Sequence, residues 1–202
     1  MSELELVKRI QKKDKAAIKE LYLRYSPVML SICVRYCGNR EDAKDVMHEA
    51  FIKIITQIGK YSGKGNFEGW MKRIMVNASL DFYKMKRKKE FVEIAEEHFS
   101  ASDDEEDIFS GTTMDKSDAE ASPNAGLVVK ADFSKEEIIE SLYLIPESYR
   151  IIFSLFVIEN YTHTEIASML GIEENASRTR LFRAKEMIKK VLYQKSIERL
   201  TK

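Results

Sequence analysis

One face of a helix predicted over residues 174–190 combines cationic, polar and aromatic side chains. Its members are Arg178, Thr179, Phe182 and Arg183. The opposite stripe follows spacings of four and three and can pack inward; it consists of Ser177, Leu181, Ala184, Ile188 and Leu192. In the DNA major groove, arginine binds guanine edges or phosphates, and an aromatic ring contacts thymine methyl groups. We therefore predict that the first face reads duplex DNA.

The residues before this helix predict the other half of a helix-turn-helix. Thr162 and Glu165 have the spacing of a capping box, which marks the start of a helix. Gly171 can adopt the positive φ that ends it, and the second helix should begin near Glu173 or Glu174. A basic helix alone also fits an ordinary solvated surface. The capped first helix and the Leu-Gly-Ile corner favour a DNA-binding helix-turn-helix instead.

A second nucleic-acid face is predicted on a helix over residues 67–90. It consists of Trp70, Arg73, Asn77, Asp81 and Lys84, opposite a stripe expected to be buried that contains Met71, Ile74, Ala78, Phe82 and Met85. A tryptophan can stack on an unpaired base, an amide can read a base edge, and the lysine run MKRKKE can hold phosphates. This face suits melted nucleic acid, although a basic helix end can also serve solubility alone.

An acidic stripe is predicted on the helix over residues 40–58. Asp42, Asp45 and Glu49 line up on the side opposite the apolar stripe. The stripe fits either a solvated surface or a docking face for a basic protein surface. A catalytic pair of carboxylates is not indicated, because no nearby residues suggest a desolvating pocket.

The composition favours an all-α protein. The chain has 202 residues, 44% of them hydrophobic, with only 3 Pro and 8 Gly. It has neither an apolar run long enough to span a bilayer nor a secretory signal at its start, so we expect a cytoplasmic protein without membrane insertion of its own. Cys33 and Cys37 are expected to be buried free thiols rather than metal ligands, and no cofactor is indicated. The net charge of zero hides strong local patches.

Two small helical domains are predicted, spanning residues 1–92 and 133–195. The intervening segment 93–132 is acidic, rich in Ser, Ala and Gly, and too poor in apolar residues to fold, so we expect a flexible linker. Pro27 should kink or interrupt a helix in the first domain, and Ser134 and Glu137 form a second capping box at the start of the other. The opposite charges of linker and DNA-binding helices would also permit a compact, autoinhibited form.

These motifs, in this order, resemble a bacterial RNA polymerase sigma factor of the extracytoplasmic-function (ECF) group. EDAKDVMHEAFIKI is similar to the family's helix that grips the polymerase clamp, and FEGWMKRIMVNASLDFYKMKRKK to its helix that melts and reads the −10 promoter element. The segment from Pro146 to Lys185 matches the family's −35-binding domain. The resemblance covers nearly all of the chain.

The resemblance implies a role for each predicted surface. Contact with core RNA polymerase would fall to Asp42, Asp45, His48 and Glu49. Recognition of the −10 element would fall to Trp70, Arg73, Asn77, Asp81 and Lys84, with Asn77 near an extruded base. Recognition of −35 DNA would fall to Arg178, Thr179, Phe182 and Arg183. The implied partners are core polymerase, promoter DNA and an anti-sigma factor.

The residues also leave other function classes open. A helix-turn-helix regulator that binds duplex DNA without directing polymerase would not need the face around Trp70. A helical adaptor whose acidic face binds a basic partner would not need Arg178 or Arg183. An enzyme fits least, because His48, His98 and His163 are scattered and no nucleophile and base are paired.

Overall fold

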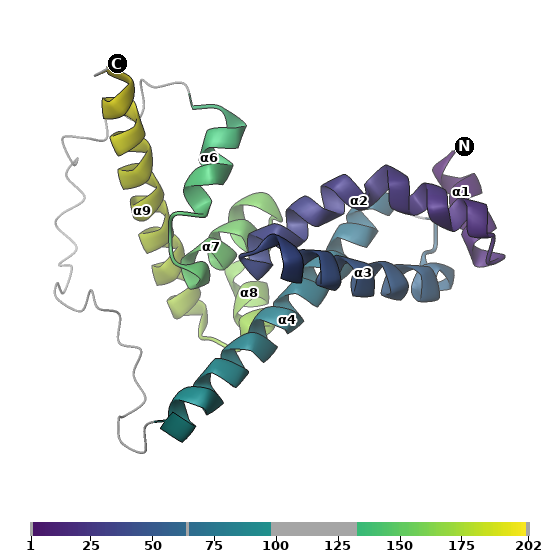
Figure 1. The fold of residues 1–202 in the computed structure, drawn as a ribbon, viewed down its shortest axis with the longest axis horizontal. Helices are drawn as coiled ribbons and strands as arrows, with labels where there is room; N and C mark the ends of the chain where they lie inside the picture. The colour runs from purple at the N-terminus through teal and green to yellow at the C-terminus, as the bar shows by residue number, and fades with distance from the viewer. Residues whose placement is uncertain (1, 64, 98–132, 201–202) are drawn as a thin grey trace.

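The computed structural model describes residues 2–63, 65–97 and 133–200, and the regular structure within these ranges is helical, as predicted (Figure 1). The N-terminal unit contains α1 (Glu3–Gln11), α2 (Lys15–Cys37), α3 (Arg40–Gln57), the 3₁₀ turn η1 (Ile58–Lys60) and α4 (Phe67–Glu97). Most of the predicted linker, residues 98–132, lies outside the described residues, whereas residues 93–97 form the end of α4. No helix of the described chain is long and apolar enough to cross a membrane.

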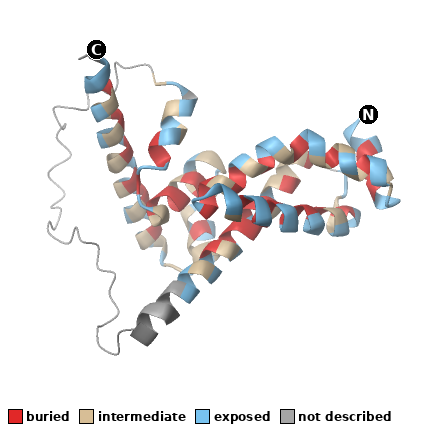
Figure 2. Cartoon of the chain, in the orientation of Figure 1, coloured by how far each residue is buried: buried red, intermediate tan, exposed pale blue. Residues whose placement is uncertain are grey.

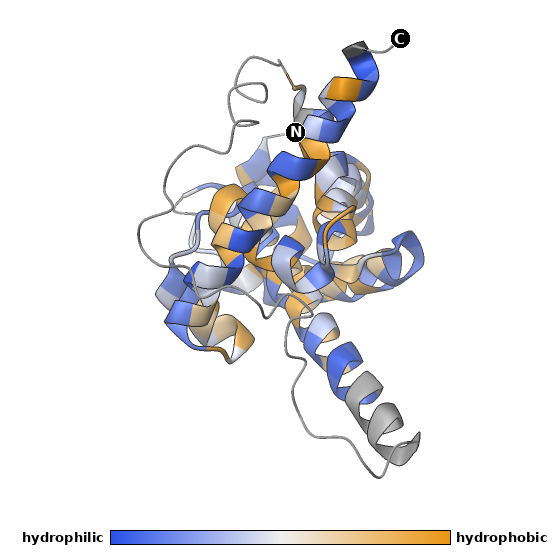
Figure 3. Ribbon diagram, turned by 90° about the vertical axis from the view of Figure 1, so that its left-hand side faces the viewer, coloured by the Kyte–Doolittle hydropathy of each residue, from blue (hydrophilic) through white to orange (hydrophobic). Residues whose placement is uncertain are grey.

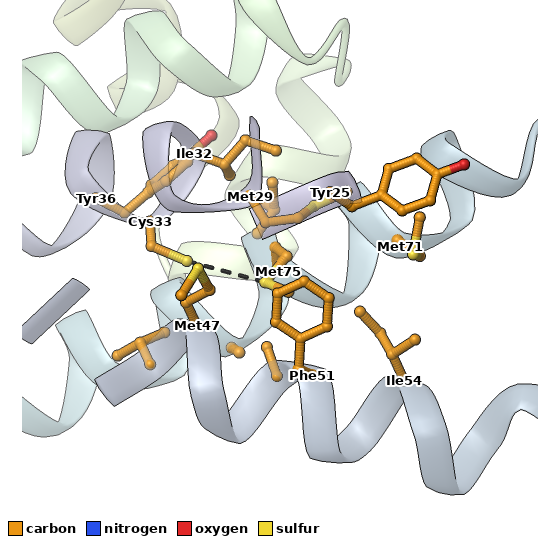
Figure 4. Close-up of a cluster of buried hydrophobic side chains, with 14 of the residues drawn as sticks. Tyr25, Met29, Ile32, Cys33, Tyr36, Met47, Phe51, Ile54, Met71 and Met75 are labelled. Atoms are coloured by element: carbon orange, nitrogen blue, oxygen red, sulfur yellow. Dashed lines mark hydrogen bonds between the residues drawn. The ribbon is translucent and has the colours of Figure 1, made fainter. Parts of the chain in front are cut away.

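The core of the N-terminal unit lies where α2, α3 and α4 meet (Figure 4). Met29 from α2, Phe51 and Ile54 from α3, and Met71 and Met75 from α4 are almost completely buried. The apolar side of this helix, predicted to lie opposite the acidic residues, is confirmed as the inner one, since Ala43, Met47, Ala50, Ile54 and Ile58 are all buried. Removal of this apolar surface from water stabilises the unit and fixes which face of each helix remains outside.

The polar ends of these helices are fixed by local hydrogen bonds. The Asp14 carboxylate accepts from the backbone N–H groups of Ala16 and Ala17 at the start of α2. At the other end Gly38 has φ 78°, a left-handed conformation that favours glycine. The predicted interruption at Pro27 is wrong, because α2 continues through it. Proline removes one backbone donor, and packing along both halves of α2 outweighs that loss.

The C-terminal unit, as described over residues 133–200, contains five elements. They are α6 (Lys135–Leu142), α7 (Glu147–Phe153), the π-helical segment η2 (Ser154–Ile158), α8 (His163–Leu170) and α9 (Glu174–Leu200). Both predicted capping boxes are present, at Ser134 with Glu137 and at Thr162 with Glu165. The predicted inner stripe of α9 is also confirmed, since Ser177, Leu181, Ala184, Ile188 and Leu192 are buried.

The two units pack against each other rather than lying apart. Helix α7 contacts α2, and α8 contacts α4, so the buried side chains of α7 continue the core of the N-terminal unit (Figures 1 and 2). Ile151, Ile152 and Leu155 belong to this continuous cluster. The long helices α4 and α9 both run outward from the shared centre, and hydrophilic and hydrophobic residues alternate along the outer part of α9 (Figures 1 and 3).

Candidate nucleic-acid and protein interfaces

The first candidate surface, here the α9 face, consists of Arg178, Thr179, Phe182 and Arg183. Packing of the opposite stripe orients it outward: Phe182 is 52% exposed, the side chain of Arg178 is 60% exposed, Thr179 is exposed and Arg183 is half-buried. An outward phenylalanine flanked by arginines, on a helix held from behind, matches a helix that enters the major groove. The structure therefore brings the four predicted residues onto one side of α9.

The α9 face is positioned by contacts between α8 and the first turns of α9. The Nδ1 atom of His163 lies 2.9 Å from the buried Oγ of Ser177, and the imidazole ring stacks on Phe156 with centroids 4.4 Å apart. Thr164 donates a hydrogen bond to Glu174, whose other carboxylate oxygen accepts from Arg178. Glu174 and His163 thus orient α9. Sequence reasoning missed these roles, although the i,i+4 spacing of Glu174 and Arg178 is a signal for such a pair.

The second candidate surface, the α4 face, consists of Trp70, Arg73, Asn77, Asp81 and Lys84. All of its members are exposed except Trp70, which is half-buried. The indole ring packs beside Tyr61 and Phe67, with centroids 5.5 Å and 5.9 Å away, so its orientation is fixed. The structure thus brings together the aromatic, amide and cationic groups that suit an unpaired base and its phosphates.

The predicted buried stripe of α4 is partly wrong. Met85 is 64% exposed, whereas Met75, Leu80 and Tyr83 are buried. The reason is that α4 packs on α2 and α3 from one side and on α8 from another, so its buried surface is wider and rotated from a single stripe. Burial raises the pKa of Tyr83, and the neighbouring guanidinium of Arg87 opposes the rise.

The α4 face borders a cleft between the two units. This cleft, about 230 Å³ in volume, is lined by Gly69, Lys72, Arg73, Glu159, Asn160, Tyr161 and Glu165. Arg73 therefore faces the loop that precedes α8. Hydrogen bonds from Thr162 lower the pKa of Glu165, and the nearby charge of Arg73 lowers it further.

The third candidate surface, the α3 stripe, consists of Asp42, Asp45, His48 and Glu49. Asp45, His48 and Glu49 are exposed, and Asp42 is half-buried because it is held by the cap residue Asn39. Tyr22 and His48 are 2.9 Å apart between the phenol oxygen and Nε2, and their rings stack, so α2 orients this imidazole.

The neighbouring Ile52 is 62% exposed and extends the α3 stripe by one turn. The sequence analysis assigned no binding role to Ile52. An apolar group beside carboxylates gives a docking surface both shape and charge.

A buried ion-pair cluster joins the two units, here called the interdomain cluster. The guanidinium of Arg35 in α2 lies 2.9 Å from the carboxylate of Glu159, and the two side chains are only 10% and 12% exposed. The Nε–H of Arg150 in α7 donates to the backbone oxygen of Arg35, 3.0 Å away, at the carboxyl end of α2. The same guanidinium approaches Glu147 at 3.4 Å. Opposite charge at a helix C-terminus is stabilising.

Some polar atoms around the interdomain cluster have no hydrogen-bond partner. Among the described residues these are the Nε of Arg35, the hydroxyl of Tyr36 and the hydroxyl of Ser154, all buried. Burial raises the pKa of Tyr36, and the charge of Glu159 raises it further, which places this phenol close to the ion pair. Each unsatisfied buried group costs about 1–3 kcal/mol.

Comparison with known proteins identifies relatives along nearly the whole chain. The family model "Sigma-70 region 2" matches residues 21–89, and "Sigma-70, region 4" matches residues 135–188. The chain is 30% identical to the RNA polymerase sigma-H factor of Pseudomonas aeruginosa over 93% of this chain and 92% of that protein. It is 26% identical to the ECF RNA polymerase sigma-E factor of Escherichia coli (strain K12), over 91% and 90% of the two chains.

The comparison also finds a relative in Bacillus subtilis. The chain is 26% identical to the ECF RNA polymerase sigma factor SigW of Bacillus subtilis (strain 168), over 92% of this chain and 94% of that protein. A solved structure of the sigma factor RpoE in complex with the anti-sigma factor NepR from Bartonella quintana aligns over 86% of this chain and 95% of that one. The identity is 15% and the TM-score 0.46.

The His163 contact predicts a pH dependence of stability. Burial, and then the charge of Arg178, lower the pKa of His163 below its usual 6.5. The imidazole of His163 therefore binds a proton more readily in the unfolded chain than in the folded chain. The stability that the neutral imidazole contributes is complete above about pH 6.5 and is lost as the pH falls below that value. The free energy of unfolding, measured with urea, should fall between pH 7.5 and pH 5.5. The fall should be smaller than about 1.4 kcal/mol per pH unit. His163→Gln should remove this part of the slope; an unchanged slope would contradict the assignment.

Proposed function

The chain belongs to the ECF group of the sigma-70 family of RNA polymerase sigma factors, and from that membership we propose which of its surfaces carries each part of the function. A sigma factor directs promoter recognition and transcription initiation by RNA polymerase and is itself no enzyme. The division into residues 1–92, 93–132 and 133–195 fits the two matched regions, 21–89 and 135–188.

The α9 face is the proposed reader of the −35 element. Its support is the exposure of Phe182 and Arg178 on a helix whose other side is buried. A helix of this kind enters the major groove, where each well-placed arginine contributes about 1–3 kcal/mol of base discrimination. The pair formed by Glu174 and Arg178 limits the freedom of the arginine before it meets DNA.

The α4 face is the proposed reader of the −10 element. Trp70 is held against Phe67 and Tyr61 with one side accessible, and Asn77 lies exposed two turns further along α4. Stacking on a base contributes about 1–3 kcal/mol and does not require a specific base, whereas the amide can select one. Trp70 would thus hold an unstacked nucleotide and Asn77 would identify it.

The α3 stripe is the proposed contact with core polymerase. Its carboxylates at Asp45 and Glu49 are exposed on the same side as Ile52, which gives a charged rim next to an apolar centre. A basic polymerase surface would complement the carboxylates. A cytoplasmic location follows, because the polymerase works there, and an anti-sigma factor is a proposed further partner, as for RpoE with NepR.

The observation that carries the assignment is the separation of two nucleic-acid faces onto two helices of one short chain. A duplex-binding regulator would need only α9. The test is run-off transcription with core polymerase on candidate promoters. A promoter-dependent transcript that requires this chain is expected, and no transcript from any candidate promoter would contradict the assignment.

Arg178→Ala should weaken binding of the polymerase holoenzyme to promoter DNA by a factor of about 5–150, the equivalent of about 1–3 kcal/mol. The matched control is Lys195→Ala, which removes the same charge near the far end of α9, where the lysine pairs with Glu140. Filter binding on wild-type and altered −35 sequences measures both. Equal losses in the two variants would mean that Arg178 contributes only charge.

Asn77→Ala should reduce binding of the holoenzyme to single-stranded −10 DNA and relax base preference at one position, while duplex binding through the α9 face persists. The matched control is Gln194→Ala, another exposed amide on a different helix. Fluorescence anisotropy with a series of −10 oligonucleotides measures the preference. An unaltered base preference in Asn77→Ala would refute the role of this amide.

A further inference from the structure

An acidic side chain lies beside the α9 face, at the end of α9 that a DNA phosphate would favour. Glu174 is in the first turn of α9, one turn before Arg178, and its side chain is 40% exposed. The N-terminal end of a recognition helix meets base edges, and the backbone N–H groups of a helix start attract phosphates. A carboxylate at this place repels the phosphate chain, which is the part of DNA that carries no sequence information. Affinity for DNA in general therefore does not account for an acid at this position.

Two hydrogen bonds hold this carboxylate between α8 and α9. Oγ1 of Thr164, near the start of α8, donates to Oε2 of Glu174 over 2.9 Å. Nη2 of Arg178 donates to the other oxygen, Oε1. The hydrogen bond from Arg178, and then that from Thr164, lower the pKa of Glu174, so this carboxyl group remains ionised at neutral pH. Helix α8 thus fixes the carboxylate, and the carboxylate fixes the guanidinium on α9.

The guanidinium of Arg178 can bind DNA while it is paired with Glu174. The side chain of Arg178 is 60% exposed, and the hydrogen bond to Glu174 uses Nη2. Its other N–H groups can still form the two parallel hydrogen bonds that an arginine makes to a guanine edge. A phosphate, by contrast, would bring a second anion next to the carboxylate. The pair therefore favours a neutral base edge over a phosphate as the partner of Arg178.

We propose that Glu174 is a positioning residue that gives Arg178 its selectivity for a base edge over the phosphate chain. This inference rests on the proposed role of the α9 face at the −35 element. Specificity is a difference between two affinities, and a repulsive group increases it by weakening binding to the wrong partner. Glu174 lowers the affinity of the α9 face for every duplex, and the oriented guanidinium restores affinity only where it meets a guanine.

The test compares Glu174→Gln with the wild-type chain, each assembled with core polymerase. Filter binding uses two duplexes, a promoter fragment identified by run-off transcription and the same fragment with its −35 element replaced. The substitution keeps the length of the side chain and an oxygen that can accept from Thr164, but removes the negative charge.

In Glu174→Gln, affinity for the replaced duplex should rise about fivefold, because Arg178 is free to neutralise one more phosphate. For the same reason, the slope of log affinity against log salt concentration should become steeper by about 0.9 on that duplex. Affinity for the promoter fragment should change by about twofold or less, so the preference for the −35 element falls. Equal changes on the two duplexes would overturn the proposal, because Glu174 would then only support the start of α9.

Two controls attribute the effect to the pair. Glu173→Gln removes the same charge from an exposed side chain one residue earlier and should leave the salt slope unchanged. In a chain that already carries Arg178→Ala, Glu174→Gln should alter neither the preference nor the slope, because Glu174 acts through the arginine. A fall in preference that persists without Arg178 would overturn the proposal, since it would indicate direct contact of Glu174 with a base.

The outcomes separate this inference from the function on which it rests. If Arg178→Ala alone leaves the preference for the promoter fragment intact, the proposed role of the α9 face at the −35 element is wrong, and the inference is wrong with it. If Arg178→Ala lowers the preference and Glu174→Gln does not, the α9 face keeps its role and only the inference about Glu174 is wrong.

Discussion

The guanidinium of Arg35 is the group on which the arrangement of this sigma factor depends. This guanidinium is almost fully buried near the end of α2 and pairs with Glu159 across the boundary between the two units. The backbone oxygen of Arg35 accepts a hydrogen bond from Arg150. A buried charge of this kind is tolerated only with its partner in place, because desolvation is costly. The position of α7 on α2, and with it that of α8 on α4, therefore follows from one polar contact and the apolar side chains of Ile151 and Ile152 around it.

The surfaces proposed to contact DNA and polymerase are the helix faces that remain exposed when the opposite faces are buried. The inner stripe of α9 leaves Phe182 and Arg178 outside, and the contact of His163 with Ser177 fixes the angle between α8 and α9. In the N-terminal unit, packing of α3 on α2 leaves the acidic α3 stripe outside, and Tyr22 orients His48 within it. Rigid cores thus position these surfaces, and the contacts of α7 with α2 and of α8 with α4 hold the two units together.

The sequence predicts what depends on local periodicity and fails where distant residues meet. Capping boxes at Thr162 and Ser134 and the α9 stripe are local patterns, and all are confirmed. The buried side of α4 is predicted less well, with Met85 exposed, because its burial depends on a partner helix from the other unit. Arg35 and Glu159 are 124 residues apart, so no local pattern indicates that they pair. The roles of the individual residues on the α4 face and the α9 face remain predictions, which are based on the family resemblance and on the exposure of these side chains.

The distance between α4 and α9 in the free protein tests this account most directly. Cysteines introduced at the exposed positions Lys88 and Lys189 can carry a fluorophore pair, and the native Cys33 and Cys37 are buried and therefore protected from labelling. Single-molecule energy transfer should give one narrow distribution of distances in the free chain, because α7 packs on α2 and α8 packs on α4. A free chain with broadly distributed distances would contradict the account, because the two units would then not be held against each other.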